Sequence, residues 1–90
     1  MSDFDPNMRY MFYAEAFEEN VMGWEPTNPA DFNVYVEETA ENYPFDECRK
    51  VLSELRLDYA VDDPRKALIA FYQADGMAEM VMADWAKVWA

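Results

Sequence analysis

The sequence predicts an all-α fold, a compact single-domain bundle of four to five short helices spanning residues 1–90. Ninety residues are enough for one domain. The hydrophobic content of 52% and the aromatic content of 17% are too high for a disordered chain, in spite of a net charge of −12. Most of the five prolines and two glycines stand where a helical pattern of apolar residues begins or ends.

The first helix is expected over residues 6–22. Its apolar positions follow a spacing of i, i+3, i+4, i+7 and i+11 and therefore share one face: Tyr10, Tyr13, Ala14, Phe17 and Val21. The opposite face mixes apolar and acidic side chains: Met8, Met11, Phe12, Met22, Glu15, Glu18 and Glu19. Such a mixed face indicates either a surface that contacts a partner or a helix that neighbours cover on two sides.

The second helix is expected over residues 29–42, after an Asn-Pro pair that is typical of a helix start. One stripe of this helix holds Phe32, Tyr35, Val36, Thr39, Ala40 and Tyr43, and the other side holds Asp31, Val34, Glu37, Glu38 and Glu41. The segment FNVYV, residues 32–36, also alternates as a strand would. The strand pattern fails after Val36, so a helix is favoured.

A third helix is expected over residues 44–57, with an apolar stripe of Phe45, Cys48, Val51, Leu52 and Leu55. Asp46 and Glu47 lie in its first turn and Arg56 in its last, as the helix dipole favours. Asp46 and Lys50 have the i, i+4 spacing of a helical ion pair.

Two more helices are expected over residues 64–74 and 77–89. Asp62 or Asp63 would cap the first of them, which buries Leu68, Phe71 and Tyr72. The last helix is unusually apolar. It is therefore either central to the bundle or buries a second face against another copy, and Trp85 and Trp89 are the candidate contacts of such a homodimer.

Several chemistries are excluded by composition. The chain has no histidine, one cysteine and two serines, so it cannot build a Ser-His-Asp, Cys-His or zinc site. Cys48 falls on an apolar stripe and is expected in the core. The acidic segment DYAVDD, residues 58–63, does not fit a calcium loop. We therefore expect no enzyme activity, no catalytic residue, no metal and no cofactor.

The acidic start of the chain lacks the apolar segment of a secretory signal, and no apolar run reaches about 18 residues. A single cysteine precludes an intrachain disulfide. We expect a cytoplasmic protein without membrane contact. The strong negative charge also argues against direct binding to nucleic acid, whose phosphates require cationic contacts.

Charge is distributed unequally along the chain. Residues 1–48 hold twelve acidic residues and one basic residue, whereas residues 49–90 hold seven acidic and six basic residues. A surface that serves only solubility normally mixes both signs. An unbalanced acidic surface is typical of a protein that meets a basic partner. The predicted partner-binding residues are Glu15, Glu18, Glu19, Glu37, Glu38 and Glu41, with Met11 and Phe12 as apolar anchors.

In its small size, its acidity and its helical, His-free and Cys-poor make-up, the whole chain resembles the small acidic inhibitors of phages and mobile elements. These include anti-CRISPR proteins and DNA-mimic anti-restriction proteins. The resemblance involves no shared motif. It implies a stoichiometric inhibitor that occupies a basic nucleic-acid-binding surface on a host defence or DNA-processing protein, in the host cytosol if phage-encoded. The alternative is an acidic helical adaptor or an oligomeric assembly or regulatory subunit.

Overall fold

Five α-helices make up the described part of the chain, and together they confirm the all-α prediction. The computed structural model describes the backbone of residues 6–89 and the side chains of residues 13–87. The helices are α1 (Pro6–Met22), α2 (Pro29–Glu41), α3 (Phe45–Glu54), α4 (Pro64–Tyr72) and α5 (Met77–Trp89). Residues 32–36 belong to a helix, as favoured, and not to a strand.

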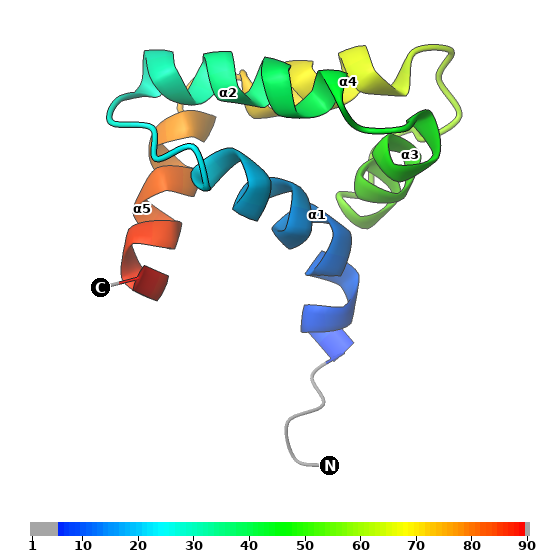
Figure 1. The fold of residues 1–90 in the computed structure, drawn as a ribbon. Helices are drawn as coiled ribbons and strands as arrows, with labels where there is room; N and C mark the ends of the chain where they lie inside the picture. The colour runs from blue at the N-terminus through cyan, green and yellow to red at the C-terminus, as the bar shows by residue number, and fades with distance from the viewer. Residues whose placement is uncertain (1–5, 90) are drawn as a thin grey trace.

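The helices are arranged around α1. Figure 1 shows α2 and α4 side by side along the top of the molecule, with α1 beneath them. Helices α3 and α5 lie on opposite sides of α1. Each of them contacts both α1 and α4. Helices α3 and α5, which are far apart in sequence, therefore both pack against α1.

The helix starts follow from local sequence. Asn28 caps α2 by accepting a hydrogen bond from the Asp31 backbone N–H at 2.9 Å. Asp63 caps α4 in the same way, accepting from the Lys66 N–H at 3.0 Å. Each cap precedes a proline, whose missing N–H costs nothing at the first helical position. Of the two candidates named for α4, Asp63 is thus the cap.

One hydrophobic core joins all five helices, and its centre is aromatic. The Phe17 ring packs edge-on against Tyr43 at 5.1 Å and lies tilted against Tyr72 at 5.2 Å. The predicted stripes supply most of the other buried side chains: Ala14, Val21, Phe32, Val36, Ala40, Cys48, Val51, Leu52 and Leu68. The core position of Cys48 is confirmed, and burial raises the pKa of its thiol.

Helix α3 ends at Glu54, three residues before the predicted end. Arg56 adopts a left-handed conformation with φ of 62°, and its N–H donates to the Ser53 carbonyl. The Leu57 N–H donates to the Leu52 carbonyl, which completes a Schellman motif. The prediction of Arg56 in the last turn was wrong because this motif usually carries glycine.

Three other side-chain predictions were wrong. Lys50 pairs with Glu47 at 3.0 Å, with i, i+3 spacing, and not with Asp46. Phe45 is 40% exposed, because its ring packs under the Arg65 guanidinium at 4.7 Å and not in the core. Met22 is buried in the core and does not belong to the exposed mixed face of α1. Helices α2 and α4 also end slightly early, at Glu41 and Tyr72.

Two arginines bind backbone carbonyls. Arg65 on α4 donates to the carbonyls of Ala40 at 2.8 Å and Tyr43 at 2.6 Å, at the end of α2. The Ala40 carbonyl also accepts from the Tyr43 backbone N–H at 3.1 Å. A cation at this position also favours the negative end of the helix dipole. Arg49 donates to the carbonyls of Tyr59 and Val61 and so holds the α3–α4 loop.

We predict that Arg65→Ala lowers the free energy of unfolding by about 2 kcal/mol or more, because two charged hydrogen bonds to backbone carbonyls are lost. Lys66→Ala removes the same charge from the next, exposed position and should change stability by less than about 0.5 kcal/mol. Urea unfolding followed by circular dichroism measures the free energy of unfolding of both variants. Equal stabilities of the two variants would contradict the role given to Arg65.

Candidate functional site

The outer side of α2 carries an exposed acidic surface, hereafter the α2 face, made of Val34, Glu37, Glu38 and Glu41. Val34 is 53% exposed. The helix contains no lysine or arginine. At a rise of about 1.5 Å per residue, the four side chains extend over roughly 10 Å. The α2 face therefore combines concentrated negative charge with an apolar residue.

Trp24 extends this surface from the turn that precedes α2. Its side chain is 57% exposed, and its ring stacks on Tyr35 of α2 at 5.7 Å, with 15° between the ring planes. The stacking gives the exposed indole a defined position. Exposed tryptophan is unusual on a surface that serves only solubility, and it is a frequent anchor at protein interfaces.

The six predicted glutamates do not form one continuous face. Glu15 and Glu19 are exposed one turn apart on α1. Glu37 is exposed on α2 but accepts a hydrogen bond from Gln73 of α4 at 2.7 Å. Glu38 and Glu41 lie exposed on the same helix. The predicted anchors Met11 and Phe12 lie outside the residues whose side chains are described, as does Trp89.

Glu18 points into the bundle. Its carboxylate accepts hydrogen bonds from the Tyr72 hydroxyl at 2.7 Å and from the Trp85 indole N–H at 3.0 Å. Burial and the neighbouring carboxylate raise the pKa of Tyr72 well above its ordinary value of 10.0. Glu18 thus links α1 to α4 and α5, a structural role that helical spacing alone did not reveal.

A second inward carboxylate belongs to Glu54 of α3. It accepts hydrogen bonds from the backbone N–H groups of Tyr13 at 2.6 Å and Ala14 at 2.9 Å. Hydrogen bonds to an ionised carboxylate are stronger than those between neutral groups. Glu54 therefore ties α3 to α1, and the sequence contains no local signal for a contact between residues 40 positions apart.

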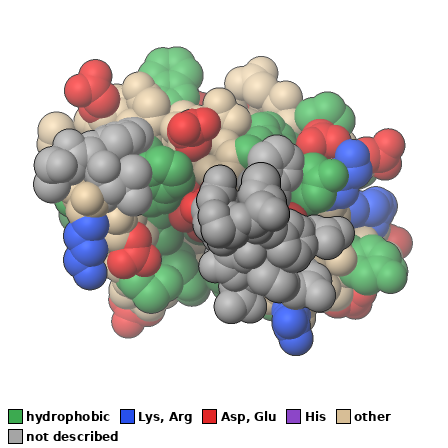
Figure 2. All heavy atoms as spheres, turned by 90° about the horizontal axis from the view of Figure 1, so that it is seen from below, with side chains coloured by type: hydrophobic (Ala, Val, Ile, Leu, Met, Phe, Trp, Pro, Cys, Tyr) green, Lys and Arg blue, Asp and Glu red, His purple; other side chains and the backbone are tan. Residues whose placement is uncertain are grey.

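The side of the molecule away from α2 and α4 has a different character. Figure 2 views this side and shows acidic, basic and hydrophobic side chains close to one another. The mixed signs there match the balanced charge of the second half of the chain. The stretch without lysine or arginine covers residues 10–48, and within it α2 carries three exposed glutamates on one side.

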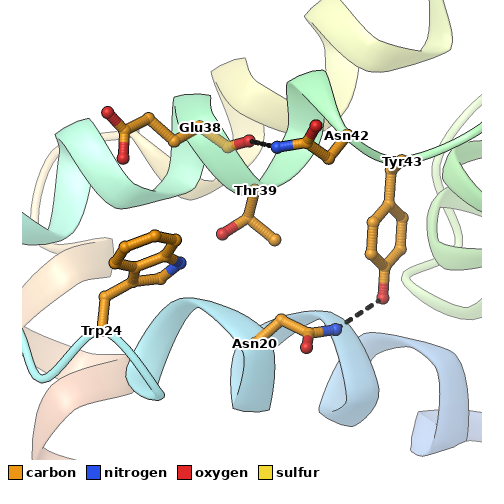
Figure 3. A pocket seen from close by; sticks show the side chains of 6 residues that line it. All are labelled: Asn20, Trp24, Glu38, Thr39, Asn42 and Tyr43. Carbon is orange, nitrogen blue, oxygen red and sulfur yellow. Dashed lines mark hydrogen bonds between the residues drawn. The ribbon is translucent and has the colours of Figure 1, made fainter.

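A groove of about 240 Å³ lies between α1 and α2, lined by Asn20, Trp24, Glu38, Thr39, Asn42 and Tyr43. Figure 3 shows that the Thr39 side chain points into it from α2 and that Trp24 borders one end. At the other end Asn20 donates a hydrogen bond to the Tyr43 hydroxyl at 3.3 Å. Asn42 donates to the Glu38 backbone carbonyl at 2.9 Å, which fixes its amide above the groove.

The Thr39 hydroxyl has no hydrogen-bond partner among the described residues, although the side chain is only 7% exposed. A buried hydroxyl without a partner costs about 1–3 kcal/mol of stability. A buried polar group without a partner calls for an explanation, and a donor from a ligand or from water in the groove would supply one. The periodicity of α2 assigned Thr39 to the core and did not reveal this groove.

Other kinds of site find no support in the described part of the chain. Within it, no group of three or more acidic or cysteine side chains is placed to hold a metal ion. Nor does any helix in this part combine the length and the apolarity that crossing a membrane requires. Comparison with protein-family models, with curated proteins and with solved structures gives no match for this chain.

We predict that Glu18→Gln lowers the free energy of unfolding by about 1–3 kcal/mol, because the amide offers a single, uncharged acceptor to two donors. Glu19→Gln changes the charge equally at an exposed neighbouring position and should have an effect below about 0.5 kcal/mol. Thermal and urea unfolding of the two variants gives the comparison. If the Glu18→Gln variant were as stable as the Glu19→Gln variant, the hydrogen bonds of Glu18 to Tyr72 and Trp85 would not stabilise the fold.

We also predict that stability falls as the pH rises above about 10. The folded state keeps Tyr72 protonated, because its pKa is raised, whereas the unfolded chain releases that proton near the ordinary value of 10.0. Cys48 and Tyr43, whose pKa values burial also raises, act in the same direction. Tyr72→Phe should lessen the decline by up to about 1.4 kcal/mol per pH unit. Urea unfolding at several alkaline pH values gives the free energy of unfolding as a function of pH. The same dependence on pH in the wild type and in Tyr72→Phe would contradict this assignment.

Proposed function

We propose that this protein is a stoichiometric inhibitor of the anti-CRISPR or anti-restriction type. Its acidic surface would occupy the basic nucleic-acid-binding surface of a host defence or DNA-processing protein and exclude the nucleic acid. The observation that carries the proposal is the α2 face, where three exposed carboxylates and an exposed valine share one helix without a lysine or arginine.

The arrangement of the basic residues supports this proposal. Arg49 and Arg65 turn their guanidinium groups to backbone carbonyls and so contribute to the fold. Lys50 pairs with Glu47 on α3. None of these contacts involves a carboxylate of the α2 face, which keeps its charge available to a partner. A negative surface of this kind accelerates association with a basic partner, and salt screens the effect.

The carboxylates of α2 approach the charge density of a DNA strand without reaching it. Glu38 and Glu41 are about 4.5 Å apart along the helix axis, given about 1.5 Å per residue. One DNA strand presents a phosphate every 3.4 Å or so along its axis. Glu15 and Glu19 on α1 would add charge to the same field. Val34 and Trp24 would supply the apolar contacts that charge alone lacks.

A second candidate function, an acidic adaptor or oligomeric assembly subunit, has one observation in its favour. Met80 on α5 is 52% exposed, and an exposed methionine on an apolar helix is typical of a protein contact. Trp85, in contrast, is partly buried and donates to Glu18. A stable oligomer in sedimentation that dissociates on Met80→Glu would favour this second function.

The partner experiment uses tagged protein to capture its targets from bacterial lysate, with and without excess duplex DNA. Mass spectrometry identifies what is bound. The proposal expects a nucleic-acid-binding protein or complex that DNA displaces. A partner that DNA leaves in place would contradict the mimicry mechanism, and capture of the chain alone would favour assembly.

We predict that reversal of the three α2 charges, Glu37→Lys, Glu38→Lys and Glu41→Lys, abolishes capture of the DNA-displaced partner, because attraction is replaced by repulsion. A matched control reverses Asp62, Asp75 and Asp84, which are exposed outside α2. Both triple variants carry a net charge of −6, since each reversal adds two to −12. The control should retain capture in the pull-down. Circular dichroism checks that both variants keep their helical fold. Equal binding by both variants would contradict the role of the α2 face.

A further inference from the structure

We propose that the groove between α1 and α2 receives the guanidinium group of one arginine side chain of the partner. This inference rests on the proposed function, because a basic nucleic-acid-binding surface is what would supply the arginine. It adds a defined contact to the diffuse charge of the α2 face. The groove lies directly beside that face, and Glu38 belongs to both.

The size of the groove points to a side chain as its occupant. Its volume of about 240 Å³ is below the range of about 300–1,000 Å³ that sites for small molecules usually occupy. The planar end of a single long side chain would fit a space of this size. The hydrogen bond between Asn20 and Tyr43 closes one end, so the occupant would enter from the side of Trp24 and Glu38.

The chemistry of the walls selects a planar cation. Thr39 contributes a buried hydroxyl oxygen without a partner among the described residues, and the exposed Glu38 at the rim extends its carboxylate along the outer side of α2 (Figure 3). Trp24 contributes an exposed aromatic ring that Tyr35 holds by stacking. A guanidinium group consists of donors alone, in a flat fork, and it stacks on aromatic rings. It can thus stack on the ring and donate to the Thr39 hydroxyl, while the Glu38 carboxylate adds negative potential at the rim.

Arginine fits this site better than lysine or a neutral ligand. An ammonium group is a compact, strongly hydrated charge that does not stack. A neutral aromatic ligand would gain nothing from the negative potential of Glu38 at the rim. Glu37 and Glu41 stand on the same helix and increase the negative potential at the mouth of the groove. Tryptophan is also the aromatic residue that binds cations most strongly.

The test is an NMR titration of the 90-residue chain with N-acetyl-L-arginine methylamide. The signals to follow are the Trp24 indole N–H and the side-chain amides of Asn20 and Asn42. We expect saturable shifts with a Kd on the order of millimolar. The citrulline analogue has a planar end group of the same shape without a charge. The lysine analogue has the charge but no planar group. Both should bind at least about fivefold more weakly.

Variants of the groove separate this site from general attraction to an acidic protein. Glu38→Gln should weaken arginine binding about tenfold, and Thr39→Val, which keeps the shape of the side chain, by about threefold. Asp62→Asn removes one exposed charge in the α3–α4 loop and should leave the Kd unchanged. Equal shifts with the citrulline analogue, or wild-type affinity in both groove variants, would overturn the inference.

The result is distinguishable from a failure of the proposed function. If arginine does not bind but the triple reversal on α2 still abolishes partner capture, the groove inference is wrong and the inhibitor proposal stands. If arginine binds in the groove but the triple reversal leaves capture intact, the groove is a guanidinium site and the mimicry mechanism is wrong.

Discussion

The Glu18 carboxylate joins three helices, α1, α4 and α5, through its hydrogen bonds. It accepts a hydrogen bond from Tyr72 on α4 and another from Trp85 on α5. Phe17, the next residue on α1, packs against the ring of the same Tyr72. The position of α1 is therefore fixed by aromatic contact and by charge-assisted hydrogen bonds at one place, and α2 and α3 pack on the helix held there.

Charge is sorted between the inside and the outside of this bundle. The inward carboxylates of Glu18 and Glu54 accept hydrogen bonds from neighbouring helices, and the guanidinium groups of Arg49 and Arg65 donate to backbone carbonyls. These groups stabilise the fold and contribute little to the charge that a partner would meet. The outward carboxylates of α2 face solvent. The proposed function depends on that outward charge, and the fold depends on the inward groups.

Much of this fold was predictable from sequence because its local signals agree with one another. Asn-Pro and Asp-Pro pairs mark the starts of α2 and α4, and apolar stripes with helical spacing identify Phe17, Phe32, Leu52 and Leu68 as core residues. The early end of α3 was not predictable, because its left-handed residue is an arginine and not a glycine. Local signals describe a helix well where its own sequence determines its ends.

The tertiary contacts of polar side chains could not be predicted in this way. The spacing of Glu18 resembles that of the exposed Glu15 and Glu19, and only the positions of Tyr72 and Trp85 show that it points inward. The groove is formed by two helices, so no pattern in either one reveals it, and Thr39 seemed an ordinary core position. Charge composition predicted that a surface exists, and the packing of helices decided which carboxylates belong to it.

The salt dependence of the affinity for the captured partner tests most directly whether the outward charge of α2 binds a basic surface. Isothermal titration over a range of sodium chloride concentrations measures the Kd. The Kd should rise steeply with salt, because screening weakens attraction between the two charged surfaces. A Kd that stays constant as salt increases would contradict it and would indicate an interface held by apolar contacts.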